Sequence, residues 1–105
     1  MKRYRVEFSD TAESELVDSI IWGVTNWGKE PTFRWARNLR QKVTTLLAAN
    51  PLAHPLAPES KWASVEVRQL IVGRYRVLFE IRGKTVNILH ITGPFIESAD
   101  RDIDG

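Results

Sequence analysis

Apolar and polar side chains alternate with a period of two in four stretches of the chain. A period of two indicates a strand that buries one face. The stretches are residues 4–8, 65–72, 74–82 and 86–91. Only short turns at Gly73 and Gly83 separate the last three. Connections this short require antiparallel neighbours.

A helical period fills the chain between the first stretch and the other three. Apolar residues recur at steps of four from residue 12 to residue 24, which predicts an amphipathic helix. Residues 9–11 offer caps for its start, and Gly28 suits its end. A second amphipathic run begins near Pro31 and stops at residues 50–51, where Asn-Pro disfavours further helix.

The order of elements is therefore β-α-α-β-β-β, an α+β fold in a single domain. We expect a helical hairpin packed on one face of a mainly antiparallel four-stranded sheet. One helical layer leaves the second face open, and we expect Leu70 and Leu78 to be exposed there. The predicted core consists of Val6, Phe8, Leu16, Ile20, Val24, Leu39, Val43, Leu46, Val77, Phe79, Ile81 and Ile88.

The composition narrows the class of protein. The chain has 105 residues, 43% of them hydrophobic, which suits one folded domain. It has no cysteine, which excludes disulfides and thiolate metal sites. No apolar run approaches the ~20 residues of a membrane span, so we expect a cytoplasmic protein without a membrane partner. Its two histidines, His54 and His90, are too few for a metal site without carboxylates, and we predict neither metal nor cofactor.

Charged and aromatic residues point to a binding surface. The formal net charge is only +2, but basic residues dominate between Arg34 and Lys84 and acidic residues gather from Glu97 to Asp104. This pattern indicates either an anionic partner or a tail that screens a basic face. Aromatic anchors dominate interfaces, so we expect at least one of the residues Trp22, Trp35 and Trp62 to face a partner.

Several segments carry a family resemblance when they are taken in order. The first predicted helix ends in Trp27-Gly28, and a later strand holds Arg68 before the turn at Gly73. The next strand opens with Tyr75-Arg76. This series resembles the RelE/ParE superfamily of bacterial toxins, and the ParE-like branch in particular, over about residues 3–92.

The resemblance implies the toxin component of a type II toxin–antitoxin system. We expect the toxin domain to span residues 3–96, and the polar composition of residues 97–105 predicts a frayed C-terminal tail. Such a toxin inhibits growth until the flexible part of a cognate antitoxin wraps and neutralises it. RelE-type members of the superfamily cut mRNA on the ribosome, and ParE-type members inhibit DNA gyrase.

Candidate catalytic residues for RNA cleavage are Arg68, Arg76 and His90. Cleavage needs an acid, a base and cations around the scissile phosphate, and Arg68 and Arg76 share strand parity. RelE-like nucleases carry a second arginine three residues after the first, where this chain has Ile71. They also carry basic residues and a tyrosine or histidine after the last strand, where this chain has Gly-Pro-Phe at residues 93–95.

The incomplete nuclease set favours a toxin that binds DNA gyrase and carries out no chemistry of its own. His90 shares parity with Val86 and Ile88, so we interpret it as a buried or half-buried strand residue. A ribosome-dependent mRNA endoribonuclease and an inactive paralogue that only binds an antitoxin are the alternatives. The predicted partner-binding residues lie on the open sheet face and are Arg68, Leu70, Arg74, Arg76 and Leu78.

Overall fold

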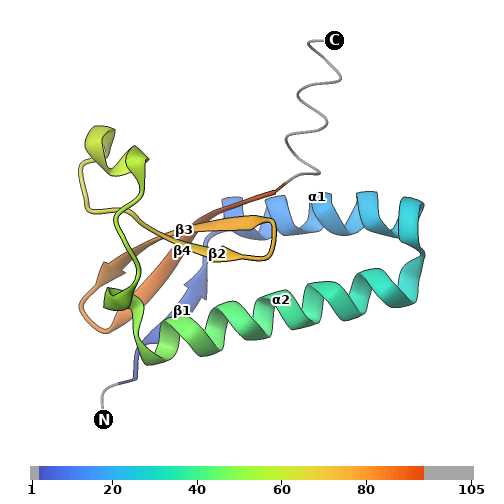
Figure 1. Cartoon of the computed structure of the whole chain (residues 1–105), viewed down its shortest axis with the longest axis horizontal. Helices are drawn as coiled ribbons and strands as arrows, with labels where there is room; N and C mark the ends of the chain where they lie inside the picture. The colour runs from blue at the N-terminus through green and yellow to red at the C-terminus, as the bar shows by residue number, and fades with distance from the viewer. Residues whose placement is uncertain (1–2, 94–105) are drawn as a thin grey trace.

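Four strands form one sheet in the order β1-β4-β3-β2 in the computed structural model, which describes residues 3–93 (Figure 1). They are β1 (Arg5–Phe8), β2 (Arg68–Val72), β3 (Tyr75–Arg82) and β4 (Thr85–Thr92). The last three strands pair antiparallel, as their short turns require, and β1 pairs parallel with β4. The predicted element order and fold class are confirmed. The predicted tail, residues 97–105, lies outside the described residues.

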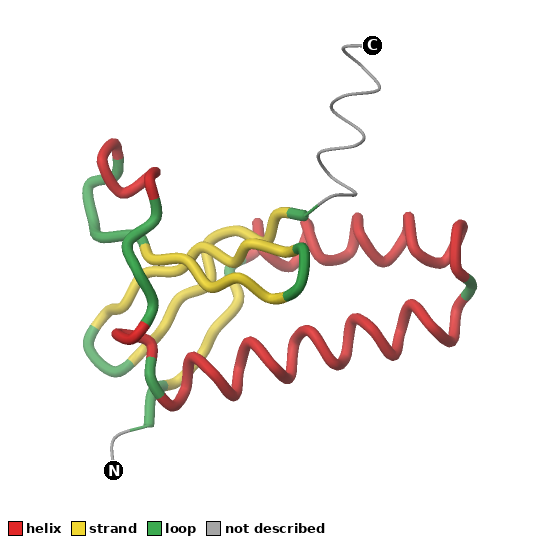
Figure 2. The backbone as a smooth tube through the Cα atoms, in the orientation of Figure 1, coloured by secondary structure: helices red, strands yellow, loops and turns green. Residues whose placement is uncertain are grey.

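Two helices follow β1 and form the predicted hairpin. Helix α1 (Asp10–Trp27) begins where the Ser9 hydroxyl accepts the N–H of Ala12 at 3.1 Å, a side-chain cap. Gly28 alone joins it to α2 (Lys29–Ala49), and its φ of 97° is a conformation that glycine adopts without strain. The helices extend well beyond the strands (Figure 2). Neither helix is both long and apolar enough to be a membrane-spanning segment within the described range.

The main core lies between this hairpin and the sheet, where both layers contribute fully buried side chains. Leu16, Leu39, Val43, Val77, Phe79 and Ile88 are buried there as predicted, and Val6, Phe8, Ile20 and Ile81 are half-buried against them. The prediction for Leu46 is wrong, because its side chain is 38% exposed. The four-residue steps of α2 run from Val43 to Leu47, which is fully buried in its place.

The expected open face of the sheet is covered by the chain itself. Leu70 faces the helical side, opposite Val77, and Leu78 packs on the other side with Ala57 and Val67. Both leucines are buried, so the prediction that they are exposed is wrong. The covering segment runs between α2 and β2 through two short 3-10 helices, η1 (Pro51–Ala53) and η2 (Pro58–Trp62). We call this second side of the sheet the outer face.

A β-bulge changes the parity of β4. Leu78 is opposite His90, but the next residue, Phe79, is opposite Ile88, so Leu89 is an extra residue in β4. The bulge moves His90 away from the buried side that Ile88 occupies. The His90 side chain is 49% exposed, so the ring is not part of the core, and the predicted parity with Val86 and Ile88 is wrong.

Helix α1 closes the edge of β4 that β1 is too short to pair. The Ser9 hydroxyl donates to the carbonyl oxygen of Leu89 at 3.1 Å. One oxygen of Glu15 accepts the N–H of Ile91 at 2.8 Å, and the other lies 3.3 Å from Nδ1 of His90. Side chains at the start of α1 therefore satisfy backbone groups of β4 that would otherwise be open to pairing with a further strand.

Candidate functional site

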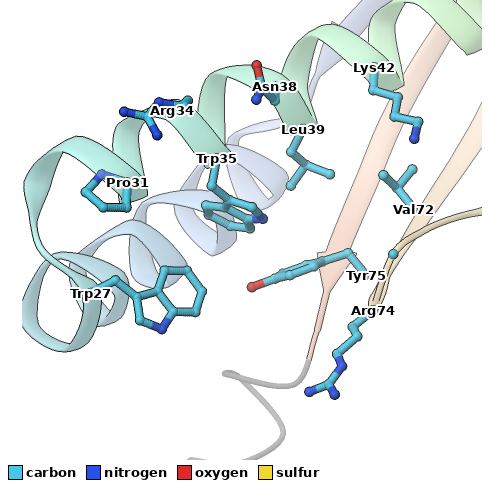
Figure 3. A pocket seen from close by; sticks show the side chains of 11 residues that line it. Trp27, Pro31, Arg34, Trp35, Asn38, Leu39, Lys42, Val72, Arg74 and Tyr75 are labelled. Carbon is cyan, nitrogen blue, oxygen red and sulfur yellow. The ribbon is translucent and has the colours of Figure 1, made fainter.

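A groove with an aromatic wall lies between α2 and the turn that joins β2 to β3 (Figure 3). Its volume is about 670 Å³. Trp35 projects into it from α2, Tyr75 from the first position of β3, and Trp27 from the end of α1. We call it the aromatic groove.

The three rings form a continuous series from the helical tip to the sheet. The centroids of Trp27 and Trp35 are 6.2 Å apart, and those of Trp35 and Tyr75 are 5.2 Å apart. Burial raises the pKa of Tyr75 to about 12, although the Ser19 hydroxyl partly opposes the shift. The phenol therefore stays neutral at physiological pH, and the ring acts as an apolar wall.

The rim of the aromatic groove is cationic. Arg34, Asn38 and Lys42 stand at steps of four on α2 and share one helix face. Arg74 lies across the groove on the turn, with its side chain directed away from α2 (Figure 3). No acidic residue is among the described residues that line the groove. None of the three cations forms an ion pair with a residue in the range 3–93. An apolar wall with a cationic rim suits a partner segment that combines apolar and acidic side chains.

The outer face holds a second cluster, in which the cation is already paired. Nη1 of Arg76 donates to one oxygen of Glu59 on η2 at 2.9 Å and to Oε1 of Gln69 at 3.1 Å. Nη2 donates to the second oxygen of Glu59, so the pair is bidentate. Mainly through this hydrogen bond, Arg76 lowers the pKa of Glu59 from 4.5 to about 2.

The three candidate nuclease residues do not share one site. Arg68 is opposite Phe79 and Arg76 is opposite Ile71, which places the two arginines on different faces of β2 and β3. The prediction that Arg68 and Arg76 share a face is therefore wrong. Arg76 is on the same face as its partner Ile71, and Ile71 is three residues from Arg68 in β2, so the two point to opposite faces. Nη1 of Arg68 donates to the carbonyl oxygen of His54 at 2.7 Å, and His90 is paired with Glu15.

Among the predicted partner-binding residues, only Arg74 lines the aromatic groove. The prediction of partner-binding residues from the sequence did not include four residues that line this groove, Arg34, Lys42, Trp27 and Tyr75. Steps of four residues from Arg34 to Lys42 on one helix were a usable signal. The closeness of that helix to the β2–β3 turn could not be predicted, because no local sequence pattern indicates which distant segments lie side by side. The described residues include no group of three or more His, Asp or Glu side chains arranged to hold a metal ion.

Comparison with protein families identifies the class. The model for the ParE toxin of the type II toxin–antitoxin system parDE matches residues 6–93. The chain therefore belongs to the ParE toxin family and is a toxin of a type II toxin–antitoxin system. No curated protein sequence matches it.

Two solved structures are similar to this fold. One is the chromosomal ParDE toxin–antitoxin system of P. aeruginosa, with a TM-score of 0.70 and 20% sequence identity over 87% of this chain and 96% of that one. The other is the RelBE2 toxin–antitoxin complex of Mycobacterium tuberculosis, with a TM-score of 0.64 and 26% identity over 90% of this chain and 94% of that one. The first supports the fold alone. The second is a toxin–antitoxin complex that contains a similar fold.

Proposed function

We propose that this toxin inhibits growth by binding DNA gyrase in the cytoplasm and does not cleave RNA. The proposal rests mainly on one observation, the bidentate pairing of Arg76 with Glu59. A guanidinium that stabilises a scissile phosphate must offer its N–H groups to the phosphate oxygens. In this chain they are directed at an internal carboxylate.

The other candidate nuclease residues support the same conclusion. The Arg68 guanidinium bonds to the backbone of His54, and the His90 ring lies against Glu15. A general acid or base has to reach the proton that it transfers, and Arg68 lies on the opposite face of the sheet from Arg76 and His90. Inhibition by binding needs only a complementary surface, so it tolerates this arrangement.

We also propose that a cognate antitoxin neutralises the toxin by placing a segment in the aromatic groove. Arg74 is the one predicted partner-binding residue that would contact this segment directly. Leu70 and Leu78 would act indirectly, by holding the β2–β3 turn in place from both sides of the sheet. The similar solved structures are of toxin–antitoxin systems, which supports a partner of this kind.

Induced expression with two separate readouts tests the activity. We expect a DNA-damage response and, with purified protein, loss of gyrase supercoiling, while mRNA on the ribosome stays intact. The variants Arg76→Ala and His90→Ala should both retain this activity. Their substitution removes the two groups that a nuclease mechanism would need most.

Two results would replace the proposal. The RelE-type alternative is favoured by the similarity to RelBE2 at 26% identity. Ribosome-dependent mRNA cuts that Arg76→Ala or His90→Ala abolishes would establish that alternative. Growth without either cuts or DNA damage, in cells where the chain still binds its antitoxin, would establish an inactive paralogue.

A further inference from the structure

The described chain ends beside the aromatic groove. Gly93 follows β4 and is buried against the Tyr75 ring, so closely that a Cβ on Gly93 would lie 2.3 Å from Cε2 of that ring. Tyr75 is itself a wall of the groove. The residues that follow Gly93 therefore start at the groove's border.

The residues beyond Gly93 have the composition that the groove would select. Residues 94–105 contain four acidic residues and one arginine, a net charge of −3. They also contain the apolar residues Phe95, Ile96 and Ile103. The family match covers residues 6–93, so this acidic segment lies outside the matched residues.

We propose that the acidic segment, residues 94–105, docks into the aromatic groove of its own chain. Its carboxylates would pair with Arg34, Lys42 and Arg74, which have no ion-pair partner in residues 3–93. Its apolar residues would cover the Trp27 and Trp35 rings. Opposite charges and apolar contacts are thus matched on both sides of the proposed contact.

Because residues 94–105 are covalently connected to the domain, weak contacts are sufficient to hold them in the groove. Twelve residues reach at most about 40 Å at ~3.3–3.6 Å per residue, comparable with the longest extent of the molecule, 41 Å. A short flexible connection gives an effective concentration of the order of millimolar. The segment therefore occupies the groove even where the separate peptide would bind poorly.

Docking of the segment would regulate access to the groove, and this consequence rests on the proposed function. An antitoxin that uses the groove has to displace the segment first. Its apparent dissociation constant rises by the inverse of the free fraction, so about tenfold if the groove is free a tenth of the time. The segment would act as a built-in competitor of the antitoxin.

Paramagnetic relaxation in the isolated full-length chain tests the docking. The chain has no cysteine, so Ser98→Cys provides a unique attachment point for a nitroxide. We expect the indole N–H signals of Trp27 and Trp35 to lose most of their intensity. Trp62 is 83% exposed on η2 at the outer face, and its signal should be retained as an internal control.

Matched variants separate specific docking from random encounters. The double substitution Arg34→Gln and Lys42→Gln should restore the Trp27 and Trp35 signals, whereas Lys84→Gln, in the β3–β4 turn, should leave them weak. Raising the salt to 1 M, where the Debye length falls from ~10 to ~3 Å, should restore them in part. Equal loss at all tryptophans, or none at Trp27 and Trp35, would overturn the proposal.

A mixing experiment tests whether the contact is intramolecular. Isotope-labelled chain without a nitroxide is mixed with nitroxide-carrying chain without the isotope label. Retained signals support docking within one chain, and signal loss at Trp27 and Trp35 would replace it with exchange between two copies. No antitoxin or gyrase is present, so failure here leaves the proposed function standing. Failure of the expression assay likewise leaves the docking intact.

Discussion

The aromatic groove and the outer face carry the same kind of cationic side chain in opposite circumstances. Arg74 at the groove has no ion-pair partner among residues 3–93, whereas Arg76, two residues along the chain, is held by Glu59. The groove is bordered by helix α2, which presents cations. The outer face is bordered by η2, which presents a carboxylate.

This contrast shows that the type of residue does not determine whether its side chain is available to bind a partner. Both arginines belong to the same family-like pattern around Gly73, and both suit phosphate or carboxylate recognition. The element packed against each arginine determines whether it stabilises the fold or can bind a partner. The predictions below test that difference, from the largest expected effect to the smallest.

Leu78→Ala should destabilise the fold by about 2–5 kcal/mol, because the side chain is buried beneath the segment that covers the outer face. Leu46→Ala is the control of equal chemistry, and its exposed position should limit the loss to below ~1 kcal/mol. Urea unfolding measures both. Equal losses for the two variants would mean that the outer face is open after all.

Gly93→Ala should cost about 1–3 kcal/mol, because the added methyl group overlaps the buried Tyr75 ring and forces it to move against Trp35. Gly73→Ala adds a methyl group in open space, and its cost of ~1 kcal/mol would come only from a φ of 59°. Tryptophan fluorescence should therefore change in the first variant. A change of the same size in both would contradict the close contact.

Arg74→Glu should speed dissociation of the antitoxin about tenfold, or ~1.4 kcal/mol, if the aromatic groove receives it. Lys84→Glu is a matched control, since each residue follows a glycine with a φ of 59° in a strand–strand turn. Surface-based kinetics at two salt concentrations measure the rates. An unchanged rate for Arg74→Glu would remove the groove from the interface.

Glu59→Gln should have the smallest effect, and it should depend on pH. The pKa of Glu59 is lowered from 4.5 to about 2 in the fold, so its contribution is present above pH 4.5 and is lost as the pH falls towards 2. Its side chain is 45% exposed, and solvent screening limits the contribution to about 1 kcal/mol or less. Urea midpoints of wild type and variant should differ at pH 7 and converge near pH 2.

The fold was predictable because each of its elements has a local signal. Alternation gave the strands, steps of four gave the helices, and short turns required antiparallel pairing in the last three strands. Leu46 shows that such patterns can misplace a buried position by one residue, since the buried side chain is that of its neighbour Leu47. One residue of helix turns a side chain by about 100°, enough to move it from core to solvent.

The candidate site was less predictable because it depends on long-range placement. An extra residue at Leu89 moves His90 to the other face, and strand periodicity does not indicate such a bulge. The pairing of Arg76 with Glu59 joins residues 17 apart through an irregular segment. Proline-rich segments without a period carry no signal for the surface that they cover.

The pairing of β1 with β4 has a consequence for the synthesis of the toxin. Residues 5–8 lie beside residues 85–88, so the sheet is completed by its first and last strands. At roughly 5–20 residues per second, a ribosome needs about 5–20 s to reach that last strand. Until then β1 has no strand to pair with and the central sheet is unfinished. The aromatic groove, whose Tyr75 wall rests against Gly93, is therefore assembled only after β4 and Gly93 have been synthesised.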